Sequence, residues 1–295
     1  MAAIASRRAA PAVGDGRARA LLDRAALLVV VLAAIWAVWE GFRWIGIRTE
    51  LTWPFPVNDV TMPRLHEIVG QLFEPSRVNG PLLIDVLLDA ALFTAREAAV
   101  GFFLGSAIGF GLAVVLVHSR LLQRGFLPYI VASQTVPILA IAPMVVVGLG
   151  SKGVTGWVAV AILAAYLTFF PVAINTLRGL QSADPRALEL MHSYAASRWT
   201  ILWRLRVPAS MPYVFSALKI SATASIVGAI IGEDTGAIQQ GLGRVITTFN
   251  QYYITGPEKL WAAILAAALL GIAFFLVIRA AEIAVLRGRP DAAEG

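Results

Sequence analysis

The chain has 295 residues, of which 58% are hydrophobic and only 14% are charged, and its mean hydropathy is +0.75. About a quarter of the residues of a soluble domain are charged, so this composition excludes a water-soluble globular protein and indicates one that is solvated by lipid. The absence of cysteine excludes disulfides, thiolate metal sites and cysteine nucleophiles. The histidines have no metal-ligand spacing, so we predict no metal site.

Six mostly apolar stretches each approach the length of about 20 residues that a helix needs to cross a bilayer. They predict an all-α integral membrane protein with six transmembrane helices, at Ala25–Ile47, Ala91–Val117, Phe126–Leu149, Thr155–Leu177, Met211–Gly232 and Leu260–Ile283. The corresponding segments are a tail (1–24), a first transmembrane helix (25–47), an outer segment (48–90), a five-helix core (91–283) that includes a loop (180–212), and a second tail (284–295).

The connecting segments alternate between basic segments and neutral or acidic ones. The first tail has five arginines against two aspartates, and the segment 178–206 has five arginines against two acids, whereas the segment 48–84 has more acids than bases. The positive-inside rule therefore predicts that both termini and the loop are cytoplasmic. Because the basic residues flank the apolar runs, they explain the net charge of +6 without a nucleic-acid partner.

The loop in the core is too long and too regular for a simple turn. Asp184 followed by Pro185 predicts a helix start, because aspartate caps free amide groups and proline suits the first turn. A second short helix is predicted over Ser197–Leu205, ending before Pro208. The loop is therefore expected to be a pair of helices joined by an exposed turn at Tyr194–Ser197.

This loop resembles the signature loop of the permease subunits of bacterial binding-protein-dependent ABC importers with the type I fold. The family signature is Glu-Ala-Ala, three residues, Gly, nine residues and Ile-x-Leu-Pro. The glutamate, the spacing and the final proline match, whereas the two alanines and the glycine are replaced: the chain has Glu189, Leu190, Met191, then Ala195, then Leu205, Val207 and Pro208. The resemblance covers about Ala91–Ile283.

The resemblance implies that the loop is the coupling helix, which docks in a groove on the nucleotide-binding subunit. The residues expected to contact the ATPase are Glu189, Leu190, Met191, Tyr194, Ala195, Ala196, Ser197, Arg198, Leu205 and Pro208. Alanine at the glycine position disfavours a backbone with positive φ, so the conformation there is open. The alternative is a solvated loop that only follows the positive-inside rule.

The chain contains no G-x-x-x-x-G-K-[ST] phosphate-binding loop. We therefore predict a non-catalytic permease subunit without a cofactor of its own, with ATP and Mg²⁺ bound by a partner ATPase. The resemblance implies ATPase subunits, a substrate-binding protein, a second permease copy and membrane lipid as partners. It also implies a multi-pass location in the bacterial inner membrane, with the outer segments in the periplasm.

The third apolar stretch contains three prolines, which weaken the hydrogen-bond ladder of a helix and free carbonyl groups. Polar side chains at mid-span face the bundle interior or a transport path, and helix–helix hydrogen bonding is an equally good explanation. The candidate path residues are Gln134, Thr135, Pro137, Pro143, Tyr166 and Glu233.

Charged residues near the helix ends have ordinary explanations. Glu233 and Asp234 are either an outer gate, as the resemblance implies, or solvated charges at the mouth, which we favour. Arg96 and Glu97 precede a run that is long enough to span by itself, so they are expected at the interface. Lys219 is expected to extend its amine to the inner surface.

The stretches SQTVPILAIAP and YYITGPEKLWAAI resemble the nitrate, sulfonate and taurine branch of the family, which includes permeases for pyrimidines and riboflavin. The expected cargo is a small solute of one of these classes, and the lack of a buried basic cluster weakly disfavours a bare anion. An ion-gradient-driven secondary transporter is the alternative, but it predicts mid-span acids and inverted halves. A membrane enzyme would need a catalytic set, and we find none.

Overall fold

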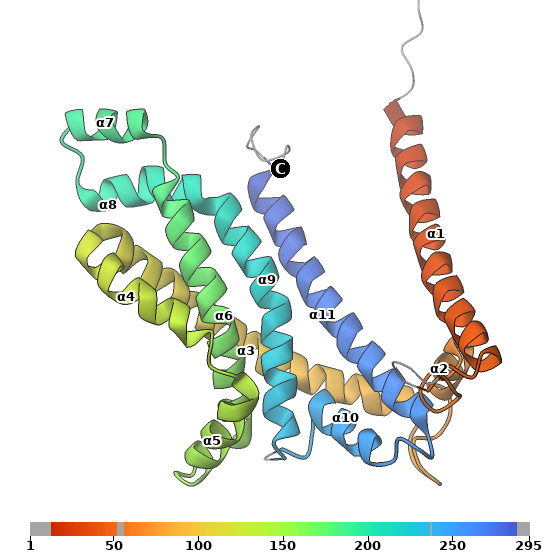
Figure 1. Cartoon of the computed structure of the whole chain (residues 1–295). Coiled ribbons are helices and arrows are strands. Elements are labelled where there is room, and N and C mark those ends of the chain that lie inside the picture. The colour runs from red at the N-terminus through yellow and green to blue at the C-terminus, as the bar shows by residue number, and fades with distance from the viewer. Residues whose placement is uncertain (1–12, 52–55, 237, 288–295) are drawn as a thin grey trace, which may run out of the picture. The chain divides into compact units, whose positions relative to one another are not determined.

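A computed structural model describes residues 13–51, 56–236 and 238–287 (Figure 1). The described residues form helices and connecting segments, and no strand occurs among them. The chain divides into two compact units, Met1–Ile68 and Val69–Gly295. Half of the first tail (residues 1–12) and the last eight residues of the second tail (288–295) lie outside the described residues.

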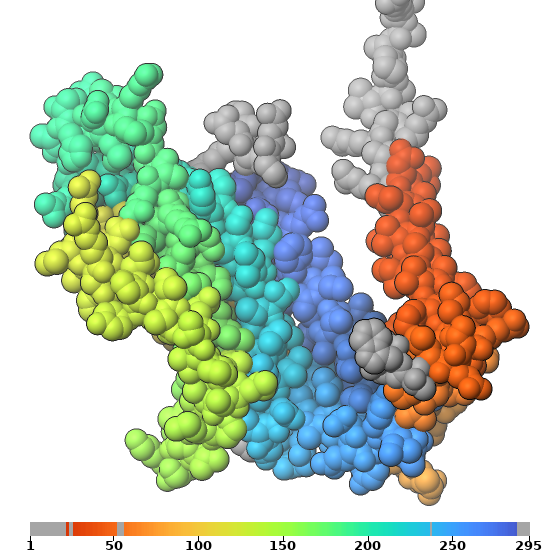
Figure 2. Space-filling view, viewed as in Figure 1, coloured from red at the N-terminus to blue at the C-terminus, as the bar shows by residue number. Residues whose placement is uncertain are grey.

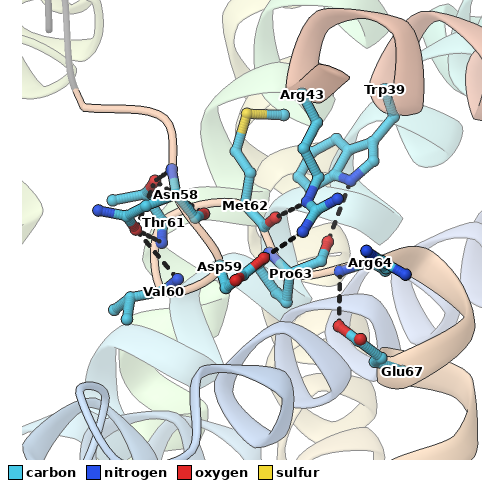
Figure 3. A network of polar contacts seen from close by, with 10 residues as sticks. All are labelled: Trp39, Arg43, Asn58, Asp59, Val60, Thr61, Met62, Pro63, Arg64 and Glu67. Atoms are coloured by element: carbon cyan, nitrogen blue, oxygen red, sulfur yellow. Dashed lines mark hydrogen bonds and ion pairs between the residues drawn. The ribbon is translucent and has the colours of Figure 1, made fainter. Parts of the chain in front are cut away.

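The first unit contains one long helix, α1 (Val13–Arg48), and the segment that follows it. Arg43 of α1 is buried, and its Nε donates a hydrogen bond of 2.9 Å to the Met62 carbonyl while its guanidinium pairs with Asp59 (Figure 3). Trp39 Nε1 donates to the Pro63 carbonyl over 3.2 Å. These bonds hold the segment after α1 against the last turns of that helix.

The second unit contains the other helices of the chain, apart from the start of α2 (Leu65–Gln71), which crosses the division. In chain order they are α3 (Leu83–His118), α4 (Arg120–Ser133), α5 (Ile138–Gly150), α6 (Gly156–Gln181), α7 (Pro185–Ser193), α8 (Arg198–Ile201), the π-helix η1 (Leu202–Arg206), α9 (Val207–Asp234), α10 (Leu242–Gln251) and α11 (Pro257–Leu286). Figure 1 shows α7 and α8 at one end of this unit and α10 at the other.

The helices confirm the predicted all-α membrane architecture, with one difference. Among the described residues, five helices are long and apolar enough to cross a membrane, and α4 and α5 together make a sixth candidate that is bent by 93°. The third stretch, predicted over Phe126–Leu149, is therefore two helices joined by a sharp bend, in line with the weakened hydrogen-bond ladder that its prolines predict. The break precedes Pro137, which has no amide hydrogen and disfavours helical geometry at the residue before it.

Helix α3 packs closely against α6 along a row of glycines. A Cβ atom at Gly101 would lie 2.4 Å from the Ala164 Cβ, and one at Gly105 would lie 2.5 Å from the Ala165 carbonyl oxygen. Glycines at four-residue spacing permit this approach because the two backbones meet without intervening side chains. Gly109 meets α6 in the same way, with the Phe169 carbonyl oxygen 2.5 Å from its potential Cβ, whereas Gly111 faces open space.

Helix α6 lies at the centre of the unit. It buries Ala159 and Leu163 against α5, and Val160 against α3 and α9. A third buried cluster lies near the end that bears α7 and α8, and contains Ala113, Leu116, Ile130, Leu177, Leu180 and Leu202. The arrangement fixes the positions of the two segments where the sequence predicts function, the α7–α8 connection and the α4–α5 break.

Candidate functional site

The first candidate region is the α7–α8 hairpin, which we define as residues 185–201. The Asp184 side chain accepts a hydrogen bond of 2.9 Å from the Arg186 amide, and Pro185 is the first residue of α7, as predicted. Ser197 begins α8 by accepting a hydrogen bond of 3.2 Å from the Thr200 amide. Both caps are local, so the sequence alone was sufficient to place the two helix starts.

One residue in the turn of the hairpin has the left-handed backbone conformation, and it stands at the position where the family signature has glycine. Ala195 has φ of +52°, and the Ala196 amide donates to the Met191 carbonyl over 3.0 Å. This six-to-one bond, with a left-handed residue inside it, is the Schellman ending of a helix. Ala195 therefore keeps the backbone geometry of glycine and bears the strain of its Cβ atom.

Replacing Ala195 with glycine should relieve this strain. We expect Ala195→Gly to stabilise α7 against local opening by about 0.5–1 kcal/mol, and hydrogen exchange of its amides to slow by about two- to five-fold. Ala196→Gly is the matched control, because its φ is not positive and glycine there only adds chain freedom. Faster exchange in Ala195→Gly would contradict the prediction.

The hairpin exposes large apolar side chains among charged and polar ones. None of the residues of α7 is buried, and the exposed fractions are 57% for Leu190, 77% for Tyr194 and 62% for Trp199. Glu189 is exposed and forms no ion pair with Arg186 in the described part of the chain. Figure 2 shows the hairpin projecting at one end of the second unit, where another protein can reach it.

We predicted that the second helix of the hairpin ends before Pro208, and this prediction is wrong. The helix continues through η1, where the Val207 amide donates to the Leu202 carbonyl, directly into α9. A π-helix shifts the hydrogen-bond register by one residue, and Pro208 follows this shift as the second residue of α9. Leu205 and Pro208 thus belong to one continuous helical segment that joins the hairpin to a transmembrane helix.

The second candidate region is the break between α4 and α5. The Tyr166 hydroxyl of α6 donates to the Ser133 carbonyl at the end of α4, which also accepts a hydrogen bond of 3.4 Å from the Val136 amide. A cavity of about 320 Å³, which we call the break cavity, lies beside this bond. Its lining includes Gln134, Pro137, Ile138, Tyr166, Phe169 and Phe170.

The structure groups three of the six predicted path residues and separates the other three. Gln134, Pro137 and Tyr166 line the break cavity. The Thr135 hydroxyl donates to the Ala132 carbonyl over 2.8 Å, and Pro143 lies exposed within α5. Glu233 belongs to a separate cluster.

Glu233 is fully buried and is not the solvated mouth residue that we favoured. Its carboxyl group accepts a hydrogen bond of 2.7 Å from the Thr94 hydroxyl of α3 and another of 2.7 Å from the Gly243 amide of α10. The Thr94 hydroxyl also accepts a bond of 2.9 Å from the Leu242 amide. Glu233 therefore ties α9 to α3 and to the start of α10, whereas Asp234 is exposed.

Two further charged residues have partners that the sequence did not indicate. Glu97 lies inside the long helix α3, is only 3% exposed and has its carboxyl group beside that of Glu233. Lys219 does not extend to the surface alone, because its amine forms an ion pair of 2.7 Å with Glu282 of α11. In both cases a partner from a distant helix determines the environment.

A larger cavity that the sequence did not indicate lies at the α10 end of the second unit. It has a volume of about 880 Å³, and its lining includes Arg77, Arg244 and Lys259 but no acidic residue. The Lys259 amine donates to the Ser76 carbonyl over 2.9 Å, which joins the start of α11 to the segment before α3. These basic residues are far apart in the sequence, so no local pattern predicted the cluster.

Comparisons with known proteins agree with the geometry. Residues 102–286 match the family described as binding-protein-dependent transport system inner membrane component. The formylaminopyrimidine transport permease protein ThiX of Halalkalibacterium halodurans is 34% identical over 73% of this chain and 86% of its own. The putative aliphatic sulfonates transport permease protein SsuC of Bacillus subtilis is 26% identical over 93% of this chain and 90% of its own.

A third relative and a solved structure extend the comparison. The nitrate import permease protein NrtB of Synechococcus elongatus is 24% identical over 83% of this chain and 82% of its own. A crystal structure of an amino acid ABC transporter with histidines covers 68% of this chain and 94% of the solved chain, with a TM-score of 0.55 and 16% identity. That likeness confirms the fold, which is the type I permease fold.

Proposed function

We propose, because this chain belongs to the family of binding-protein-dependent transport system inner membrane components, that it transmits force from a separate ATPase to the transport path through the α7–α8 hairpin. The chain is a membrane-spanning ABC permease subunit for small solutes, and members of this family are generally non-catalytic. The observation that supports the coupling role is the exposed hairpin with Ala195 in the glycine conformation of the family signature. Its continuity with α9 through η1 supplies a rigid connection to a transmembrane helix.

In the proposed assembly, ATPase subunits bind one end of the permease and a substrate-binding protein binds the other end. ATP and Mg²⁺ are assigned to two ATPase subunits, because the chain lacks a phosphate-binding loop. Two permease copies form the path, as the family resemblance implies. The substrate-binding protein docks at the α10 end, where the basic cavity with Arg77, Arg244 and Lys259 suits an acidic surface.

The proposed cargo is a small solute that the break cavity can contact. Gln134 and Tyr166 offer polar groups there, Phe169 and Phe170 offer aromatic rings, and no charged residue lines the cavity. Such a lining favours a heterocycle of the vitamin-precursor kind over a bare anion such as nitrate or a sulfonate, because a desolvated anion requires a charged or multiply donating partner. The assignment of Gln134, Pro137 and Tyr166 to the path is part of this proposal.

The charge reversal Glu189→Lys tests the coupling role. We expect the variant to fold and to lose ATP-driven transport by about ten-fold or more, because a reversed charge at a protein interface costs several kcal/mol. The measurements are copurification of the ATPase with the tagged permease and substrate uptake into proteoliposomes. Asp23→Lys, in the first half of α1, is the control for a charge reversal outside the hairpin.

The same preparation separates the proposal from its alternative. An importer of this kind retains its ATPase and stops when ATP is removed, whereas a secondary transporter works on an ion gradient alone. Glu97 lies within α3, whereas Glu233 is the second-to-last residue of α9, so of these two buried acids only Glu97 departs from the span-end position that argues against gradient-driven transport. Full transport by Glu189→Lys, or uptake without any ATPase, would refute the coupling role.

The proposed orientation, with both termini and the hairpin in the cytoplasm, has an equally direct test. The chain has no cysteine, so one introduced thiol is the sole target of a membrane-impermeant maleimide. We expect Gln251→Cys in α10 to be labelled in intact cells whose outer membrane is permeabilised, and Ser193→Cys in α7 to be labelled only after lysis. Labelling of Ser193→Cys from outside would reverse the topology.

A further inference from the structure

A small cavity with a basic lining lies where the end of α3 meets the α7–α8 hairpin. Its volume is about 160 Å³, and we call it the hairpin cavity. Four of its six lining residues have nitrogen-bearing side chains, none is acidic, and they come from three helical elements and η1: Val117, His118, His192, Arg198, Ile201 and Arg206. The cavity is separate from the proposed transport path, and of the residues expected to contact the ATPase only Arg198 lines it.

The two arginines of the hairpin cavity have no acidic partner. In the part of the chain that the structure describes, ion pairs join only Arg43 to Asp59 and Lys219 to Glu282. Arg198 and Arg206 thus present two unpaired guanidinium groups to one small space. A guanidinium has a planar set of donors that matches the oxygens of a carboxylate or a phosphoryl group.

The His118 ring of the cavity lining has two contacts that orient it. His118 Nδ1 lies 2.7 Å from the Val114 carbonyl oxygen, and the His118 ring lies 5.6 Å from the ring of Trp199. His118 is the last residue of α3, whereas His192 belongs to α7. A bound anion would therefore contact both the hairpin and the end of a transmembrane helix.

The size of the cavity limits the ligand. The volume of about 160 Å³ equals that of roughly five water molecules. This space is sufficient for one tetrahedral oxyanion with some water, and it is too small for a nucleotide. The chemistry and the size together indicate a phosphoryl group.

The position of the cavity identifies where such groups are abundant. His118 ends α3, and Arg206 directly precedes α9, and both helices belong to candidate membrane spans. The cavity therefore lies near the ends of two candidate spans. Basic pockets between transmembrane helices on the cytoplasmic side suit anionic headgroups.

We propose that the hairpin cavity binds a phosphoryl group, from the headgroup of an anionic lipid or from free phosphate, and that this ligand joins the α7–α8 hairpin to the end of α3. Arg198 and Arg206 supply the charge, and His118 and His192 complete the wall. Only the consequence for coupling, a hairpin that moves together with α3, depends on the proposed function. The binding itself does not.

The experiment uses the full-length purified permease without its ATPase, so a failure of the coupling role does not affect it. The probes are nanodiscs of phosphatidylglycerol or phosphatidylcholine, and inorganic phosphate added to protein in detergent. The measurements are the lipid retained in native mass spectrometry and the shift in Tm. The test variant is Arg206→Gln, and the control is Arg204→Gln, which removes the same charge from η1 outside the cavity.

We expect the wild type and Arg204→Gln to bind phosphatidylglycerol, phosphate or both, and Arg206→Gln to bind at least about ten-fold more weakly. A response to phosphatidylglycerol alone identifies the headgroup as the source, and a response to inorganic phosphate identifies the free anion. Equal weakening in the two variants, or no binding of either probe by the wild type, would overturn the proposal. If Arg206→Gln does not fold, Arg198→Gln, whose side chain is exposed, provides the same comparison.

Discussion

Replacing Gly105 with isoleucine is expected to lower the free energy of unfolding by about 3 kcal/mol or more. A Cβ atom at this position would lie 2.5 Å from the Ala165 carbonyl oxygen and 2.8 Å from the Thr168 Cβ. The nearest atom belongs to the backbone of α6 and cannot rotate away, so the two helices must separate. Separation would also loosen the contacts of Gly101 and Gly109, which meet α6 on the same row.

The effect of Gly105→Ile is measured as a fall in Tm in detergent and as a loss of monodisperse protein on size-exclusion chromatography. Gly111→Ile is the matched control, because the same residue is introduced in the same helix at a site with no atom within 4 Å of the new Cβ. We expect a change of less than about 0.5 kcal/mol for that control. Similar Tm values for the two variants would refute the close packing of α3 and α6.

Gly241→Ala is expected to have the second largest effect, about 3 kcal/mol of destabilisation. Gly241 has φ of +93° and ψ of 163°, a region that only glycine occupies without strain. A Cβ atom there would also lie 2.2 Å from the carboxyl carbon of Glu233. The alanine variant must therefore displace Glu233 from the hydrogen bonds that it accepts from Thr94 and Gly243.

Gly236→Ala separates the two causes of this destabilisation. Gly236 also has a positive φ, of +81°, but no atom lies within 4 Å of its potential Cβ. We expect this control to lose about 1 kcal/mol from backbone strain alone. Thermal unfolding, combined with proteolysis of the segment between α9 and α10, measures both variants. An equal loss in the two would show that Glu233 is not held as the structure describes.

The sequence by itself determined the features that depend on local chemistry. Apolar runs of sufficient length predict the spans, since a helix in lipid satisfies its backbone within its own segment. The caps at Asp184 and Ser197 were also predictable, because each capping hydrogen bond joins residues that are two or three positions apart. Pro137 marks the break in the third span, although its angle does not follow from the residue type.

Only the tertiary structure decided the environment of the charged residues and the shape of the cavities. Glu233 appeared to end a span in solvent, but its partner Thr94 is 139 positions away, and Lys219 pairs with Glu282 at a distance of 63 positions. The break cavity, the hairpin cavity and the basic cavity at α10 likewise combine residues from separate helices. Periodicity and capping act within one segment, whereas burial and pairing depend on which segments pack together.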